Sequence, residues 1–202
     1  MGGGPFRLLA VCRGNISRSP AAEYLFRAQL DARFEVASAG IGAYQVVGSG
    51  VDRWTMALLG KRGIHPTAHA ARQLNRAMIG AADLILTMSL AQRSWVVGEV
   101  PRALQRTFTL REFSRLAVAV RSQHPRSLSE MIQRAAANRA VYPVALGGCD
   151  EIADPNGGSI ADYRAAFDAV DATVAVVASE ISQFAQLRVP VMARQPHAEF
   201  VL

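Results

Sequence analysis

The unit that opens the chain, a short apolar run followed by a loop and a helix start, restricts the fold most. Residues 6–11 are mostly apolar and predict a buried strand. After the loop, Ser19 and Pro20 are favourable residues for the cap and the first position of a helix. Because strands that alternate with helices usually pair in parallel, this unit predicts an α/β fold.

The remainder of the chain continues this alternation. Further strands are expected at residues 34–39, 83–88 and 107–110, with helical stretches between them. The last helix gives the clearest pattern, because its apolar side chains recur three or four residues apart. They are Ile160, Tyr163, Phe167, Val170, Val174, Val177 and Ile181. We therefore expect a parallel sheet, with Cys12 at the carboxyl edge where ligands bind in such folds.

Composition narrows the class of function. No apolar run reaches the roughly 20 residues that span a membrane, and residues 1–5 lack the basic start and apolar core of a signal peptide. We therefore expect a cytoplasmic protein without a membrane partner. Lys61 is the only lysine among 22 basic side chains, and the arginines are spread along the chain rather than clustered. This distribution does not predict a nucleic-acid partner.

The loop at residues 11–20, with the sequence VCRGNISRSP, combines a cysteine with an arginine six positions later. A thiolate is a strong nucleophile, and a helix N-terminus and an arginine both favour this anion. A loop wrapped around one centre directs its backbone N–H groups inward, and Arg18 can add two hydrogen bonds to phosphate oxygens. Gly14 and Asn15 tolerate the left-handed backbone angles of a tight loop. We predict a phosphate-binding catalytic loop in which Cys12 accepts a phosphoryl group.

The spacing of Cys12 and Arg18 is not specific by itself, because arginine is abundant in this chain. A small buried residue at a strand end is the alternative interpretation of Cys12. The strand before the loop and the helix start after it favour the catalytic interpretation.

Further motifs follow the loop in a fixed order. Together with the loop they resemble the low-molecular-weight protein-tyrosine phosphatases over roughly residues 6–185. The resemblance implies a three-layer, flavodoxin-like α/β fold, in which a four-stranded parallel sheet carries helices on both faces. The motifs that carry the resemblance are Ser38-Ala39-Gly40, residues 48–52, residues 69–74, residues 82–88 and Asp154-Pro155.

The resemblance implies three catalytic roles. Cys12 attacks phosphorus, Arg18 binds the equatorial oxygens, and Asp154 protonates the leaving oxygen. A nucleophile and a general acid must be different groups on opposite sides of the phosphoryl group, which agrees with this division. Asp150 and Glu151 are alternatives for the acid when the residues are considered alone, and the Asp-Pro pair favours Asp154.

The resemblance also implies supporting roles around the loop. Ser19 corresponds to the hydroxyl that hydrogen-bonds the thiolate. Asn15 corresponds to the residue that holds the loop in shape, supported by Ser38 and His69. The residues that the resemblance implies for substrate binding are Arg13, Gly14, Asn15, Ile16, Ser17, Ser19 and Tyr44.

The chain departs from the family pattern at two places. The family often has aromatic residues directly after Asp-Pro, where this chain has Asn156-Gly157-Gly158, so that Tyr44 is left as one aromatic wall of the cleft. The segment before the acid is also longer, and we expect a helical insertion near residues 117–144. Such an insertion forms a flap near the cleft, a partner surface, or a tolerated surface addition. We expect one domain over residues 1–188 and a mobile tail at residues 189–202.

The leading hypothesis is a phosphatase that hydrolyses phosphotyrosine or related phosphomonoesters through a phosphocysteine. Its partners would be a phosphorylated protein or a small phosphomonoester, and we expect no cofactor. One alternative is a thiol-dependent arsenate reductase, which normally needs further cysteines, whereas only Cys149 is available. A non-catalytic phosphoprotein-binding module is the other. A metal site is not expected, because the histidines lack ligand spacing with cysteines. They are His65, His69, His124 and His197.

Overall fold

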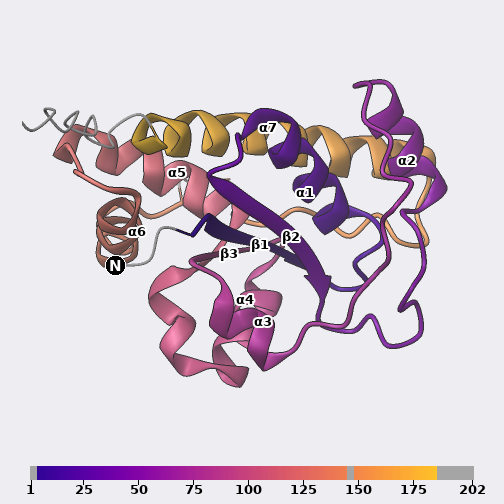
Figure 1. The fold of residues 1–202 in the computed structure, drawn as a ribbon, viewed down its shortest axis with the longest axis horizontal. Helices are drawn as coiled ribbons and strands as arrows, with labels where there is room; N and C mark the ends of the chain where they lie inside the picture. Colours follow the sequence, from indigo (N-terminus) through magenta and orange to yellow (C-terminus); the bar gives the residue numbers. More distant parts are fainter. Residues whose placement is uncertain (1–3, 145–147, 186–202) are drawn as a thin grey trace, which may run out of the picture.

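Four parallel strands form the centre of the computed structural model, which describes residues 4–144 and 148–185 (Figure 1). β1 (Phe6–Cys12) pairs with β2 (Phe34–Gly40) on one side and with β3 (Leu84–Thr87) on the other. β4 (Thr107–Thr109) pairs with β3, and the order is β2-β1-β3-β4. This is the strand order of a doubly wound, flavodoxin-like sheet, so the predicted fold class is confirmed.

Helices cover both faces of the sheet. α1, α5 and α7 share one buried cluster with the sheet, while α3, α4 and η1 share the other. α2 packs beside α7, and α6 packs on α5. The bounds are α1 (Arg18–Gln29), α2 (Arg53–Gly60), α3 (Arg76–Ala81), α4 (Leu90–Glu99), η1 (Pro101–Arg106), α5 (Leu110–Val120), η2 (Arg121–Gln123), α6 (Leu128–Ala137) and α7 (Ile160–Ala185). No helix of the described residues combines the length and the apolarity that crossing a membrane requires.

The side chains of β1 alternate between the two layers, as the strand period requires. Leu8, Ala10 and Cys12 belong to the cluster beneath α1 and α7, whereas Leu9 and Val11 belong to the cluster beneath α3 and α4. Cys12 is the last residue of β1. Its thiol therefore lies at the carboxyl edge of the sheet, on the side where α1 begins.

Helix ends account for two differences from the predicted elements. The fourth strand ends at Thr109 because this residue caps α5: its hydroxyl accepts a hydrogen bond from the Glu112 N–H, and the Glu112 carboxylate accepts one from the Thr109 N–H, both at 3.1 Å. In α7 the predicted apolar stripe is buried from Phe167 onward. Ile160 is 49% exposed, since it stands at the first position of the helix.

The segment expected as an insertion contains the end of α5, η2 and α6. Leu128, Met131 and Ile132 of α6 are buried in the same cluster as α5 and α7. The helix therefore adds to the core layer instead of standing apart from it. The tail expected at residues 189–202 lies outside the described residues.

Arg139, two residues after the end of α6, covers the edge of the sheet. Arg139 donates a hydrogen bond to the Thr107 carbonyl at 2.7 Å, and its guanidinium lies 4.3 Å from the centroid of the Phe108 ring. Its Nε also donates to the buried Glu112 carboxylate at 3.0 Å. Because an open edge strand can pair with other chains, these contacts protect β4.

Replacing Arg139 with alanine should lower the free energy of unfolding by about 2 kcal/mol, because the Glu112 carboxylate and the Thr107 carbonyl lose a charged donor. Arg126→Ala is the matched control, since the Arg126 side chain is 90% exposed. The control should shift the free energy by less than about 0.5 kcal/mol. Urea unfolding of both variants measures the difference, and equal midpoints would contradict the role of Arg139.

Candidate active site

The loop between β1 and α1, here called the phosphate loop (residues 12–19), turns sharply around Asn15. Asn15 has φ 56°, in the left-handed region that asparagine tolerates. Gly14 does not have a positive φ, so the expectation of a left-handed angle applies to Asn15 alone. The predicted helix start is wrong by two residues, because α1 begins at Arg18 and Ser17 occupies the cap position.

The thiol of Cys12 lies inside this loop and is 3% exposed as a residue. Its Sγ accepts hydrogen bonds from the Asn15 N–H at 3.3 Å and from the Ser19 hydroxyl at 3.0 Å. Ser19 is therefore not the helix cap that the sequence predicted, but a first-turn residue whose hydroxyl is directed at the sulfur. Two donors and the N-terminus of α1 surround Sγ, and all three favour a negative charge there.

The side-chain amide of Asn15 holds the loop to its surroundings. Its Nδ2 donates to the Ser19 hydroxyl at 3.0 Å and to the Ser38 hydroxyl at 2.7 Å. Its Oδ1 accepts from the Arg72 N–H at 2.8 Å, and its backbone carbonyl lies 2.9 Å from Nε2 of His69. The structure thus brings these residues together around Asn15, where the resemblance places its supporting group.

Glu23 completes this network and was not singled out from the sequence. It is 3% exposed, and its carboxylate accepts a hydrogen bond from the Ser38 hydroxyl at 2.5 Å and pairs with Arg27 at 2.6 Å. Because Ser38 donates to Glu23, its oxygen is free to accept from Asn15. The spacing of Glu23 and Arg27 suggests only an ordinary surface pair on a helix, so the sequence carries no signal for this burial.

Arg18 and Asp154 meet at the mouth of the loop. Arg18 is 4% exposed, and its guanidinium forms an ion pair with the Asp154 carboxylate. Its NH1 donates to the Ile152 carbonyl at 2.9 Å. The other two candidate acids have different partners, because Asp150 pairs with Arg115 and Glu151 accepts from the Leu90 N–H. The Asp154 side chain, 40% exposed, is the one of the three that lies beside Arg18.

The phosphate loop and the segment after β2 both carry side chains that are expected to bind substrate. Arg13 is exposed, Tyr44 is 74% exposed, and Ile16 is half-buried. The chain after β2 is fixed beside the loop, since the Ile41 N–H donates to the Cys12 carbonyl at 3.0 Å and the Gly42 N–H donates to the Arg13 carbonyl at 2.9 Å. Residues 156–158, which follow Asp154 and Pro155, are exposed. The part played by these positions and by Tyr44 as walls of a cleft stays a prediction.

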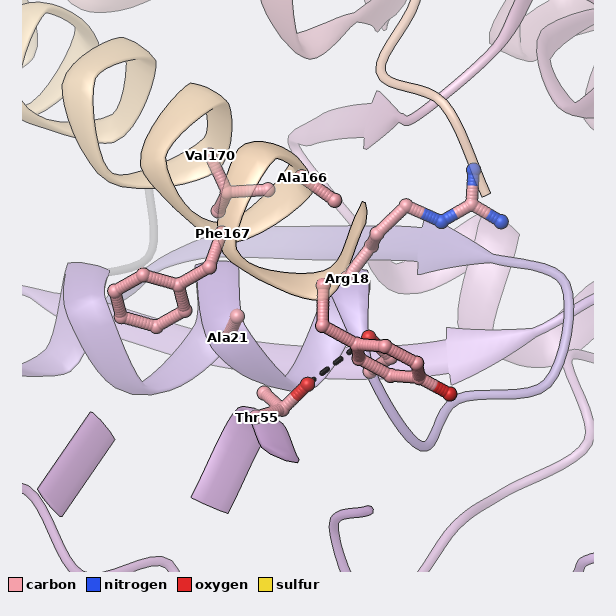
Figure 2. Close-up of a pocket in the computed structure, with 8 residues that line it drawn as sticks. Arg18, Ala21, Thr55, Ala166, Phe167 and Val170 are labelled. Atoms are coloured by element: carbon pink, nitrogen blue, oxygen red, sulfur yellow. Dashed lines mark hydrogen bonds between the residues drawn. The ribbon is translucent and has the colours of Figure 1, made fainter. Parts of the chain in front are cut away.

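Next to the loop, side chains of α1, α2 and α7 line a pocket (Figure 2). The Ser17 and Thr55 hydroxyls lie 3.0 Å apart across it and form a hydrogen bond. Tyr163 of α7 also borders it, and burial followed by the charges of Asp52 and Asp154 raises the pKa of its phenol. The residues that line the pocket are Ser17, Arg18, Ala21, Thr55, Tyr163, Ala166, Phe167 and Val170. This hydrogen bond links the phosphate loop to α2, and the Ser17 hydroxyl therefore already has a partner within the protein.

Acidic, histidine and cysteine side chains are not grouped in threes that could hold a metal ion, in the part of the chain that the structure describes. Cys12 and Cys149 are both free thiols, the first buried and the second exposed. The polar groups at the phosphate loop are thus donors and one carboxylate, a set suited to binding a tetrahedral oxyanion.

Known proteins share both the sequence pattern and the fold. The profile of the family described as low molecular weight phosphotyrosine protein phosphatase matches residues 7–119. A protein-arginine-phosphatase of Geobacillus stearothermophilus is 30% identical over 178 residues, which is 88% of this chain and 97% of that relative. A solved structure of an arginine phosphatase from this organism superposes with a TM-score of 0.67, at 30% identity, covering 89% of this chain and 94% of the other.

Other relatives are described as tyrosine phosphatases, and the sequence match to one of them covers a shorter part of the chain. A probable low molecular weight protein-tyrosine-phosphatase of Ralstonia nicotianae is 37% identical over 112 residues, 55% of this chain and 75% of the relative. A solved tyrosine phosphatase of Erwinia amylovora is 25% identical, covers 87% of this chain and 93% of its own, and has a TM-score of 0.65.

Gly40 sets the path of the phosphate loop by steric contact. A Cβ at this position would lie 2.4 Å from the Arg13 carbonyl oxygen and 2.9 Å from the Asn15 nitrogen, closer than atoms can approach. Gly40→Ala should therefore displace the loop and weaken binding of inorganic phosphate at least about tenfold, a change of 1.4 kcal/mol.

Gly42→Ala is the matched control for this prediction, because its Cβ would meet nothing closer than 3.8 Å. Calorimetric titration of both variants with phosphate measures the effect, and the control should stay near the wild-type affinity. Equal affinities in the two variants would contradict the steric account.

Proposed function

This chain is a phosphatase that belongs to the low-molecular-weight phosphotyrosine protein phosphatase family, and from that premise we propose that Cys12 is its nucleophile and Asp154 its general acid. One observation carries this assignment: two hydrogen-bond donors converge on the Cys12 sulfur, and Arg18 of the same loop forms an ion pair with Asp154. A buried thiol that only fills space needs neither the donors nor the ion pair.

In the first step, the Cys12 thiolate attacks phosphorus as the bond from phosphorus to the leaving oxygen breaks. The backbone N–H groups of the phosphate loop and the Arg18 guanidinium bind the phosphoryl oxygens, and their positive charge stabilises the transition state. Asp154 gives its proton to the leaving oxygen. A phosphoryl group that binds Arg18 competes with the Asp154 carboxylate for the guanidinium. Once released from this ion pair, Asp154 takes up a proton from solvent, and this is the proton that it gives to the leaving oxygen.

In the second step, water replaces the leaving group. The Asp154 carboxylate takes a proton from this water, the water oxygen attacks phosphorus, and the bond between sulfur and phosphorus breaks. Inorganic phosphate leaves, and the thiolate is restored. Donors from Asn15 and Ser19 stabilise the departing thiolate, so the same two hydrogen bonds assist both steps.

Phosphotyrosine on a protein is the substrate we propose first. Tyr44 presents an exposed ring on the segment after β2, which is hydrogen-bonded to the phosphate loop through Ile41 and Gly42, and such a ring can pack against an aromatic substrate. Phosphoarginine is the second candidate, because the relative that spans 97% of its own length in the match is a protein-arginine-phosphatase. Both substrates need the same nucleophile and the same acid, so the difference concerns the border of the cleft. We also propose a cytoplasmic location, which the need for a reduced catalytic thiol supports.

Hydrolysis of p-nitrophenyl phosphate with EDTA present tests the two catalytic assignments. Cys12→Ser should reduce turnover to background, and Asp154→Asn should reduce it about a hundredfold. Asp31→Asn is the matched control for the acid, because Asp31 pairs with Arg33 beyond the far end of α1 from the phosphate loop. It should keep the wild-type rate within about twofold. Full activity in Cys12→Ser would contradict the nucleophile.

Assays of the wild-type protein separate the competing functions. Wild-type protein that reduces arsenate with a thiol donor and leaves the ester intact would establish the reductase instead. Tight phosphopeptide binding without turnover would establish a binding module. Comparison of matched phosphotyrosine and phosphoarginine peptides then ranks the two proposed substrates by kcat/KM.

A further inference from the structure

We propose that Arg115, Asp150 and Glu151 are positioning residues that set where Asp154 stands for proton transfer. The segment concerned, here called the acid loop (residues 148–158), carries Asp154 between α6 and α7. The inference rests on the proposed function, since it assigns to this loop the delivery of the general acid. None of the three side chains touches the reacting atoms, and they act through the backbone that leads to Asp154.

The first anchor is a two-pronged ion pair. Arg115 of α5 donates from NH2 to Oδ2 of Asp150 at 2.7 Å and from Nε to Oδ1 at 3.4 Å. The two side chains are 28% and 13% exposed, respectively. Such a paired contact fixes direction as well as distance, and partial burial reduces its screening by solvent. Arg115 also donates to the Tyr142 carbonyl, so one guanidinium holds the chain before and at the start of the acid loop.

The second anchor is the N-terminus of α4. The Glu151 carboxylate accepts a hydrogen bond from the Leu90 N–H at 2.8 Å, at the first residue of that ten-residue helix. A carboxylate is favourable there because the helix dipole places positive charge at this end. The adjacent residue is fixed as well: the Ile152 N–H donates to the Met88 carbonyl at 2.9 Å, and Ile152 is 3% exposed.

Downstream of these anchors, the hydrogen bonds of the loop are local, from the Asn156 N–H to Oδ1 of Asp154 at 3.2 Å and from the Gly158 N–H to the Pro155 carbonyl at 2.9 Å. Ala153, Asn156 and Gly157 are exposed, and Gly157 has φ 79°. Asp154 follows Ile152 by only two residues, so the fixed residues upstream set the position of its backbone, while Arg18 pairs with its carboxylate. The two acids that lie three and four positions before it thus serve to hold the loop, which explains why three acidic residues lie so close together.

Loss of an anchor should show in the dependence of the rate on the leaving group. A good leaving group such as p-nitrophenolate departs with little help from an acid, whereas phenolate needs the proton. We expect Arg115→Met to lower kcat/KM for phenyl phosphate about tenfold more than for p-nitrophenyl phosphate. Methionine keeps the apolar stem of the side chain and removes the ion pair. Asp150→Asn removes the charge from the other partner and should give a smaller change in the same direction.

Arg121→Met is the matched control. Arg121 lies just beyond the end of α5, and pairs with Glu180 of α7 instead of the acid loop. This variant should lower kcat/KM for both substrates by the same factor, or leave both values unchanged. Urea unfolding of each variant shows whether it is folded, and the ratio of the two rates reports positioning separately from stability.

The test is completed in the Asp154→Asn background, where no acid remains to be positioned. There, Arg115→Met should leave the ratio of the two substrates unchanged. A uniform loss for both substrates in Arg115→Met, no loss in either anchor variant, or an undiminished effect in the Asp154→Asn background would each overturn the positioning role. Failure of the proposed function looks different, because Cys12→Ser would then retain turnover of both substrates.

Discussion

Every polar group of Asn15 is hydrogen-bonded within the buried side of the phosphate loop. The backbone N–H donates to the Cys12 sulfur, the carbonyl meets His69, and the side-chain amide bonds to Ser19, Ser38 and the Arg72 N–H. Because Asn15 is fully buried in a left-handed conformation, these bonds must all be satisfied together or the conformation is not maintained. The position of the thiol, and with it the direction of the loop N–H groups, follows from this residue.

The parallel sheet supplies the frame that such a loop needs. β1 and β2 are paired along their whole length, and Gly40 at the end of β2 lies against the loop backbone. The helix that begins at Arg18 adds its N-terminus to the same side of the sheet. Strand, loop and helix therefore act as one unit, and an anion at the carboxyl edge of the sheet meets N–H groups and a guanidinium at once.

Sequence patterns predicted the elements whose signals are local. The apolar run of β1 and the alternation of strands and helices were sufficient for the fold class, and the loop sequence was sufficient to single out Cys12 and Arg18 as candidates. Ser19 was misassigned as a cap because serine before proline favours a helix start, while its actual partner, the Cys12 sulfur, is set by the path of the loop. Glu23 was missed because only the packing of α1 on β2 brings it to Ser38.

The acid loop shows the same limit. Three acidic residues lie within five positions, and in the sequence only the Asp-Pro pair favours Asp154. Their surroundings differ clearly only in the fold, where α5 and α4 supply partners for Asp150 and Glu151. The contact of Arg139 with the edge strand also depends on where α6 lies, which no local pattern specifies. The lesson is physical: periodicity encodes burial and element type, while the assignment of one charged group to another is made by the assembled fold.

A covalent intermediate on Cys12 is the central claim, and it can be observed directly. Asp154→Asn protein should accumulate the phosphocysteine, because the carboxylate that activates water is missing from the second step. Mass spectrometry of acid-quenched, digested protein after mixing with p-nitrophenyl phosphate should find one phosphoryl group on the peptide that contains Cys12. Turnover of the ester with the phosphoryl group on another residue, or with no phosphorylated peptide at all, would contradict the account.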